Sequence, residues 1–171
     1  MAPRSDTESR ISHPSETRSP MFVHDFSVVH LPVGEAIRRF TARITDHTIV
    51  PMVRASWEAD ATVLVQAGMA APSQVIPRSL RATIGGYRIR NDSAVAAIAW
   101  HATGCWLPSL DADLELAAFG PAHSHVHLMG RYDLPDGIDR FSPTGSLVQR
   151  VMVVVVRQFL SLVADELARP D

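Results

Sequence analysis

A long apolar stretch near the C-terminus, with the sequence VMVVVVRQFLSLV from Val151 to Val163, constrains the fold of this chain most strongly. Its consecutive valines favour extended backbone, because β-branched side chains are stiff about χ1. A membrane-spanning helix needs about 20 predominantly apolar residues, whereas this uninterrupted run lies between Arg150 and Arg157. We therefore do not expect a membrane span, and the choice is between a buried strand and a helix.

The residues that flank this stretch indicate a helix. Ser146 and Gln149 have the S-x-x-Q spacing of a capping box, and Arg169 followed by Pro170 is typical of a helix end. Between these ends an apolar stripe follows helical spacing, formed by Val148, Met152, Val155, Phe159 and Val163. We expect a helix of about 24 residues, about 36 Å long.

Composition limits the classes of protein to which the chain can belong. The 171 residues are 46% hydrophobic, which is enough for one domain with a substantial core. A formal net charge of -2 and the lack of a basic run argue against nucleic acid as a partner. The single cysteine, Cys105, excludes an intrachain disulfide, and the N-terminus lacks the apolar core of a secretion signal, so we expect a cytoplasmic protein.

The first twenty residues differ from the rest of the chain. They are rich in Ser, Pro and mixed charge and contain hardly any large apolar side chain, so we expect a disordered tail over residues 1–20. A single domain should then span residues 21–171. Glycine-rich phosphate loops and the H-E-x-x-H and C-x-x-C motifs are missing from the sequence, so we expect no cofactor.

Hydrophobic patterning predicts an α+β fold. We expect a strand from Met21 to Pro32, a helix over residues 34–44, a short helix near residues 51–57 and a strand over residues 62–68. Strands should follow over residues 78–90, 93–104, 111–120 and 123–132, and the pair Gly85-Gly86 should form a bulge that restores the phase of the first of these. The order gives a curved antiparallel sheet of about six to seven strands against the C-terminal helix.

The space between this sheet and the helix is the expected site. A straight helix cannot follow a curled sheet, and the inward positions of the strands carry several small residues, namely Ala96, Ala102, Ala118 and Gly130. An apolar cavity would result. The alternative is that Trp100, Phe159 and the two short helices fill the gap and the core is solid, and the pattern does not decide between the two.

Several segments resemble the START-like superfamily, which includes the polyketide cyclase or SRPBCC proteins, in an uncharacterised bacterial branch. The matching segments are Trp100–Gly104, Leu110–Glu115, Phe119–Pro121, Gly130–Tyr132, Arg150–Val151 and Arg157–Leu160, within residues 22–168. The resemblance implies a helix-grip fold, in which an antiparallel sheet wraps around a long C-terminal helix. The space between the sheet and the helix then holds a hydrophobic ligand. This chain departs from the family in the histidines at positions 123, 125 and 127 and in the unclear region 45–70.

Three groups of residues are candidates for a role. We expect the ligand-binding cavity to be lined by Trp100, Ile98, Leu114, Leu116, Val126, Leu128, Tyr132, Met152, Val155 and Phe159. Tyr132 and the first-strand histidines His24 and His30 are candidates for acid-base catalysis. His125 and His127 have the H-x-H spacing of a metal-binding pair, but they belong to the outer, wet face of the strand, so we predict no metal site.

Three functional hypotheses follow. The first is binding of a small apolar or amphipathic ligand between the sheet and the C-terminal helix, without catalysis. The second is a polyketide-type cyclase or dehydratase that uses the same cavity. The third is a protein-interaction module with a filled core; the sequence does not indicate an oligomeric state.

Overall fold

The computed structural model describes residues 20–66, 68, 70, 71, 74, 77–105 and 107–170, so the predicted tail over residues 1–20 lies almost entirely outside the described residues. One antiparallel sheet dominates the fold, with strand order β1-β5-β4-β3-β2. The strands are β1 (Met21–Val29), β2 (Ser79–Arg90), β3 (Ser93–Thr103), β4 (Ser109–Ala118) and β5 (Ser124–Asp133). The helices are α1 (Val33–Thr45), α2 (Val50–Gln66) and α4 (Pro143–Ala168).

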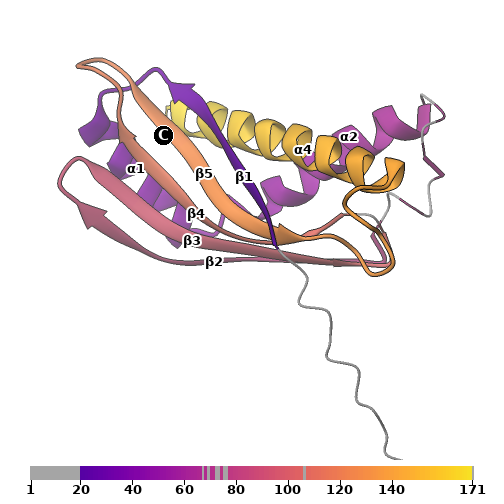
Figure 1. The fold of residues 1–171 in the computed structure, drawn as a ribbon. Helices are drawn as coiled ribbons and strands as arrows, with labels where there is room; N and C mark the ends of the chain where they lie inside the picture. The colour runs from indigo at the N-terminus through magenta and orange to yellow at the C-terminus, as the bar shows by residue number, and fades with distance from the viewer. Residues whose placement is uncertain are drawn as a thin grey trace, which may run out of the picture.

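The arrangement is the helix-grip α+β fold that the sequence predicts. Strands β2 to β5 form consecutive hairpins, and β1 closes the sheet beside β5. The long helix α4 runs along one face, beside β1 and β5, and α1 and α2 lie on the same side of the sheet (Figure 1). We call the face under the helices the inner face and the opposite one the outer face.

The prediction of six to seven strands is wrong in number, because the described residues form five. The strand expected over residues 62–68 is instead the end of α2, which continues to Gln66. Its sequence, Thr62 to Val65, is apolar without a clear period, and such a run fits a buried helix as well as a strand. Packing of α2 against α4 favours the helix here.

Helix α4 begins earlier than the sequence predicts. Its N-cap is Ser142, whose Oγ accepts a hydrogen bond from the Gly145 amide at 3.0 Å, and Pro143 occupies the first helical position. Proline is favoured there because its missing N–H would have no partner in the helix. Ser146 therefore lies inside the helix, and Gln149 donates a hydrogen bond to the Arg140 carbonyl instead of closing a capping box.

By length and composition α4 could cross a membrane, since its mean hydropathy reaches 1.7 over an 18-residue window. Half of that window is buried inside the protein. The predicted stripe, Val148 to Val163, is fully buried against the rest of the molecule, whereas Val153 and Val154 face outward at 41% and 49% exposure. The apolar character of α4 is thus largely used in packing against the sheet and α2.

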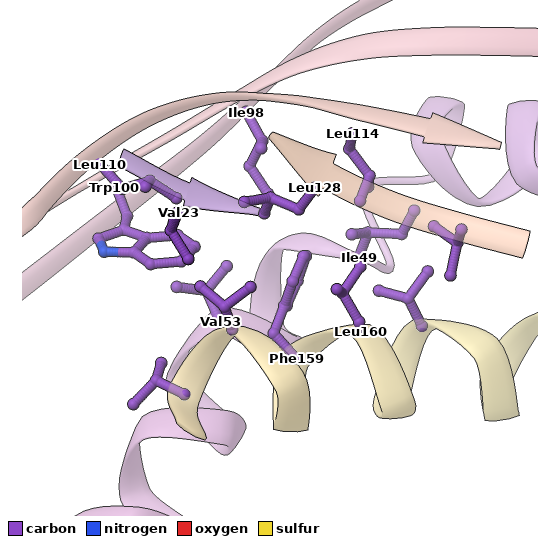
Figure 2. Packing of buried hydrophobic residues seen from close by; sticks show 14 of the residues in the cluster. Val23, Ile49, Val53, Ile98, Trp100, Leu110, Leu114, Leu128, Phe159 and Leu160 are labelled. Atoms are coloured by element: carbon purple, nitrogen blue, oxygen red, sulfur yellow. The ribbon is translucent and has the colours of Figure 1, made fainter. Parts of the chain in front are cut away.

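Alternation along the strands separates the two faces of the sheet. Leu114 and Leu116 on β4 pair in register with Leu128 and Val126 on β5, and all four are buried beneath the helices. The register between β2 and β3 shifts between Ile84 and Tyr87, which is the bulge expected at the glycine pair. The inner face carries the core shown in Figure 2.

Candidate functional site

The ten residues predicted to line a ligand meet in one cluster between the sheet and α4. None of them is more than 4% exposed. The rings of Trp100 and Phe159 meet edge to face, with 6.2 Å between their centroids, and Figure 2 shows residues of the strands and of α4 pointing toward one another. The sequence-derived set therefore comes together in space, drawn from three strands and the C-terminal helix.

The two short helices contribute to the same cluster. Phe40 of α1 and Val53 and Trp57 of α2 are at most 1% exposed, as is Ile49 in the turn between the helices. They occupy the side of the inner face that α4 does not cover, near β2, β3 and β4. In this conformation side chains of the two short helices pack into the space over the small residues of the sheet. Of the two alternatives left open by the sequence, an open cavity or a solid core, this packing corresponds to the solid core.

A hollow of about 780 Å³ lies at the end of this core, where the β3–β4 and β5–α4 connections meet. We call it the end hollow. Its apolar lining comes from Ala102, Leu107, Pro108, Leu134 and Ile138. Its polar lining includes His101, Thr103, Asp133 and Asp136, so the lining is amphipathic.

Trp100 connects the end hollow with the buried cluster. Its indole Nε1 donates a hydrogen bond to the carbonyl of Pro108 at 3.0 Å, and Pro108 lines the hollow. Trp100, Leu110 and Tyr132 lie side by side across β3, β4 and β5, because they pair in register. The hydrogen bond to Pro108 therefore ties the lining of the hollow to the buried cluster.

Two titratable groups at this end of the sheet have raised pKa values. Burial raises the pKa of the Tyr132 phenol, which keeps it protonated at neutral pH. Burial likewise raises the pKa of the Cys105 thiol, although a hydrogen bond from the Leu107 amide opposes the shift. A thiol with a raised pKa carries little thiolate, so Cys105 is poorly suited to act as a nucleophile.

The first-strand histidines lie on the outer face. His24 pairs in register with Met129, and its ring meets that of His127 with 5.9 Å between centroids. His30 stacks edge to face on His123 at 5.1 Å. Neither imidazole faces the inner cluster, so of the three acid-base candidates only Tyr132 is placed near a ligand held there.

The expected metal candidates also lie on the outer face. His127 Nε2 is 3.0 Å from Glu115 Oε2, and the rings of His125 and His127 are 5.2 Å apart between centroids. Burial acts to raise the pKa of Glu115, but hydrogen bonds from His127 and Ser93 outweigh it and lower that pKa. Burial and the charge of His127 lower the pKa of His125. Within the described residues no three His, Cys, Asp or Glu side chains group as metal ligands.

Sequence reasoning missed the end hollow. Its walls come largely from two connections, through residues 104, 105, 107 and 108 of one and residues 134–136 and 138 of the other. These connections have no periodic pattern, and their meeting depends on the strand order. A usable signal was the length of the connection between two strands: β3 ends at Thr103, and β4 begins only at Ser109. Long connections at one sheet end are the usual place for a binding site.

Comparison with known proteins gives matches among solved structures only. No family model matches the chain, and no curated protein matches it. A protein of Thermus thermophilus has 10% sequence identity and a TM-score of 0.42, over 86% of this chain and 97% of that one.

Two further structures match at similar levels. A START superfamily protein from Mycobacterium smegmatis has 5% identity and a TM-score of 0.39, over 84% of this chain and 97% of that one. An aromatase/cyclase from a Streptomyces species has 14% identity and a TM-score of 0.32, over 88% and 95%. By its own strand order, antiparallel register and long C-terminal helix, the chain has a START-like, helix-grip fold.

Proposed function

We propose that this protein binds a small amphipathic molecule at the end hollow, with the apolar part of the ligand directed toward the inner face of the sheet. The observation that carries the proposal is the hollow itself, which has about 780 Å³ of space directly beside the buried cluster. Ligand pockets in proteins commonly have about 300 to 1,000 Å³. The volume therefore suits a small organic molecule.

The lining supports an amphipathic ligand over a purely polar one. Leu107, Pro108 and Leu134 offer an apolar wall, and Asp133 with Asp136 offers carboxylates at the rim. Removal of apolar surface from water favours binding by about 25 cal/mol per Å². Polar groups at the rim then fix the orientation of the ligand.

The residues predicted from the sequence form the deeper part of the proposed site. Trp100 is linked to the lining of the hollow by its hydrogen bond to the Pro108 carbonyl, and Phe159 of α4 contacts Trp100 within the buried cluster. They are packed against one another, so a ligand reaches them only by displacing side chains. We expect shape and stacking contacts here and no covalent chemistry.

Titration with 1-anilinonaphthalene-8-sulfonate, an amphipathic fluorescent anion, tests the proposal. We expect saturable binding, measured as an increase in the fluorescence of the probe. Leu134→Trp should fill the hollow and weaken binding at least tenfold. Phe141→Trp is the matched control, because Phe141 is 78% exposed and does not line the hollow.

Two outcomes would contradict the proposal. One is binding of equal affinity in Leu134→Trp and the parent protein, with circular dichroism showing both folded. The other is the absence of saturable binding, together with native mass spectra of the purified protein that contain no bound small molecule. Either result leaves the interaction-module hypothesis as the better account of a filled core.

A further inference from the structure

On the outer face, a hollow of about 660 Å³ separates arginines of β2 from carboxylates of β4. We call it the outer trough; Arg88 and Arg90 form one wall, Asp113 and Glu115 the other, and Val95 of β3 the floor. The register explains this shape, because Arg88 pairs with Val95 and Val95 pairs with Glu115. A short side chain thus lies between two rows of longer charged ones.

The charges on the two walls do not neutralise each other. Their rows are two strands apart, which is about 10 Å at the usual strand spacing. Within the described part of the chain, Arg88, Arg90 and Asp113 take part in no ion pair. The ion pairs that do form join neighbours along a helix or residues of adjacent elements. Opposite charges are therefore held apart across an open space.

The carboxylate wall is organised by its neighbours on β5. His127 Nε2 lies 3.0 Å from Glu115 Oε2, which fixes the position of that carboxylate. Met129 pairs in register with Asp113 and is 58% exposed, so it adds an apolar surface beside the acidic wall. The trough thus combines a cationic wall, an anionic wall and apolar contacts from Val95 and Met129.

We propose that the outer trough binds a small zwitterion, a molecule that carries an anionic carboxylate or phosphate at one end and an ammonium group at the other. The anion contacts the guanidinium groups of Arg88 and Arg90, which form strong charge-assisted hydrogen bonds with oxyanions. The ammonium lies by Asp113 and Glu115, which are two residues apart on β4 and so about 7 Å apart. The methylene groups of the ligand cover Val95 and contact Met129. This site is independent of the end hollow, which shares none of its lining residues.

Geometry sets the preferred length of the zwitterion. The backbones of β2 and β4 are about 10 Å apart, and within the described residues no ion pair joins the two walls. The two charged groups of the ligand must therefore be separated by more than one carbon atom. In an α-amino acid the two charges are adjacent and too close together to reach both walls. γ-Aminobutyrate, with three methylene groups between its charges, matches the gap better.

Isothermal titration with glycine, γ-aminobutyrate and ε-aminocaproate tests the site on the full chain. We expect saturable binding that is tightest for γ-aminobutyrate and at least tenfold weaker for glycine. Butyrate and propylamine each carry one charge, and each should bind at least tenfold more weakly than the zwitterion. Equal binding of butyrate and γ-aminobutyrate, or no saturable binding of any zwitterion, would overturn the proposal.

Substitutions test which residues form the site. Arg88→Ala and Asp113→Asn should each weaken the binding of γ-aminobutyrate at least tenfold. Arg81→Ala is the matched control, because Arg81 lies on the outer face of the same strand but opposite His101, outside the trough. Unchanged affinity in the combined variant of Arg88→Ala and Arg90→Ala would sink the proposal, provided that its thermal unfolding matches that of the control.

The same chemistry occurs free in solution and as a lipid headgroup. Titration with phosphoethanolamine tests the free form, and cosedimentation with phosphatidylethanolamine vesicles tests the lipid form. Binding of phosphoethanolamine that is lost in Arg88→Ala supports a free ligand. Vesicle binding that phosphoethanolamine displaces supports a headgroup as the natural source. Failure in both assays, together with failure of the amino acid series, rejects the site.

Discussion

The two faces of the sheet are built from the same strands but differ in chemistry. On β4, Leu114 and Leu116 lie beneath the helices and are fully buried, whereas Asp113 and Glu115 between them face outward. On β5 the buried Val126 alternates with outward histidines in the same way. A period of two along each strand thus separates the core from nearly all the ionisable groups of the sheet.

The two faces differ in how they are covered, and this difference underlies the ligand that we propose for each. The inner face is covered by α1, α2 and α4, and the end hollow lies at one end of it. The outer face has no covering helix, and its polar groups define the outer trough. Apolar binding is therefore expected at an end of the core, and charge recognition on the open face.

The largest difference in the free energy of unfolding between a substitution at a buried position and one at an exposed position should appear on α4 itself. Phe159 is fully buried against Trp100, whereas Val154 on the opposite side is 49% exposed. Phe159→Ala leaves a cavity and should lower the free energy of unfolding by about 3 to 5 kcal/mol. Val154→Ala should change it by less than about 0.5 kcal/mol. Urea denaturation of both variants measures the contrast, and a similar effect of the two changes would show that α4 does not cover the core as described.

A second contrast concerns two glycines of the sheet. A Cβ added at Gly130 would overlap the Cβ of Ala112 and lie 2.6 Å from the carbonyl oxygen of Asp111. Gly130→Ala should therefore force β4 and β5 apart and cost about 1 to 3 kcal/mol. A Cβ at Gly86, in the bulge, meets nothing within 4 Å. Gly86→Ala should be near neutral in the same denaturation experiment, and a larger loss there than at Gly130 would contradict this account of the sheet.

Most of the inner face could be predicted from the sequence. Alternation over residues 111–132 identified which side chains face the helices, because a strand with one buried face must carry apolar residues at every second position. The Gly85-Gly86 bulge was predictable for the same reason, since the apolar positions change parity there. The stripe on α4 followed from helical spacing and includes the contact of Phe159 with Trp100.

The features that could not be predicted from the sequence depend on contacts between segments that are distant along the chain. The helical end of α2 is apolar without a period, so only its packing against α4 determines its structure. The end hollow forms where two aperiodic connections meet. The direction in which His24 points could not be predicted from the sequence, because β1 pairs with β5, about a hundred residues later, and the register between them sets which side chains point outward. Local patterns carry no information about such pairings.

The packing of α4 over the inner face should be weakened by the loss of hydrogen bonds that α1 makes to the C-terminal end of α4. Arg39 of α1 is 13% exposed and donates hydrogen bonds from Nη1 to the carbonyls of Leu167 and Arg169, at 3.0 and 2.7 Å. These carbonyls end the helix and have no partner within it. Arg39→Ala should destabilise the protein by about 1 to 2 kcal/mol, because hydrogen bonds from charged groups are the stronger ones. Arg38→Ala, at a side chain that is 57% exposed, is the control. Equal thermal stability of the two variants would contradict a role for Arg39 in holding α4.

The smallest effect is expected on the outer face, as a dependence of stability on pH. His125 contacts Phe26 of β1 and Phe119, and the nearest charged groups are His127 and Glu115. Burial, followed by the charge of His127, lowers the pKa of His125 below its ordinary 6.5, although Glu115 opposes the shift. The unfolded chain then takes up this proton at a higher pH than the folded one. His125 therefore contributes stability above pH 6.5 that is lost as the pH falls toward its lower, folded pKa.

Glu115 acts in a separate pH range, so the two groups can be distinguished. Its pKa is lowered below the ordinary 4.5, so its contribution is present above that pH and is lost only under more acidic conditions. His125→Gln should flatten the fall in melting temperature just below pH 6.5, and it should leave the loss below pH 4.5 in place. His101→Gln, at an exposed position, is the matched control. If His125→Gln left the profile below pH 6.5 unchanged, the partly buried aromatic contacts of His125 would not govern its titration, and the outer face would be as open to water at β5 as it is along β2.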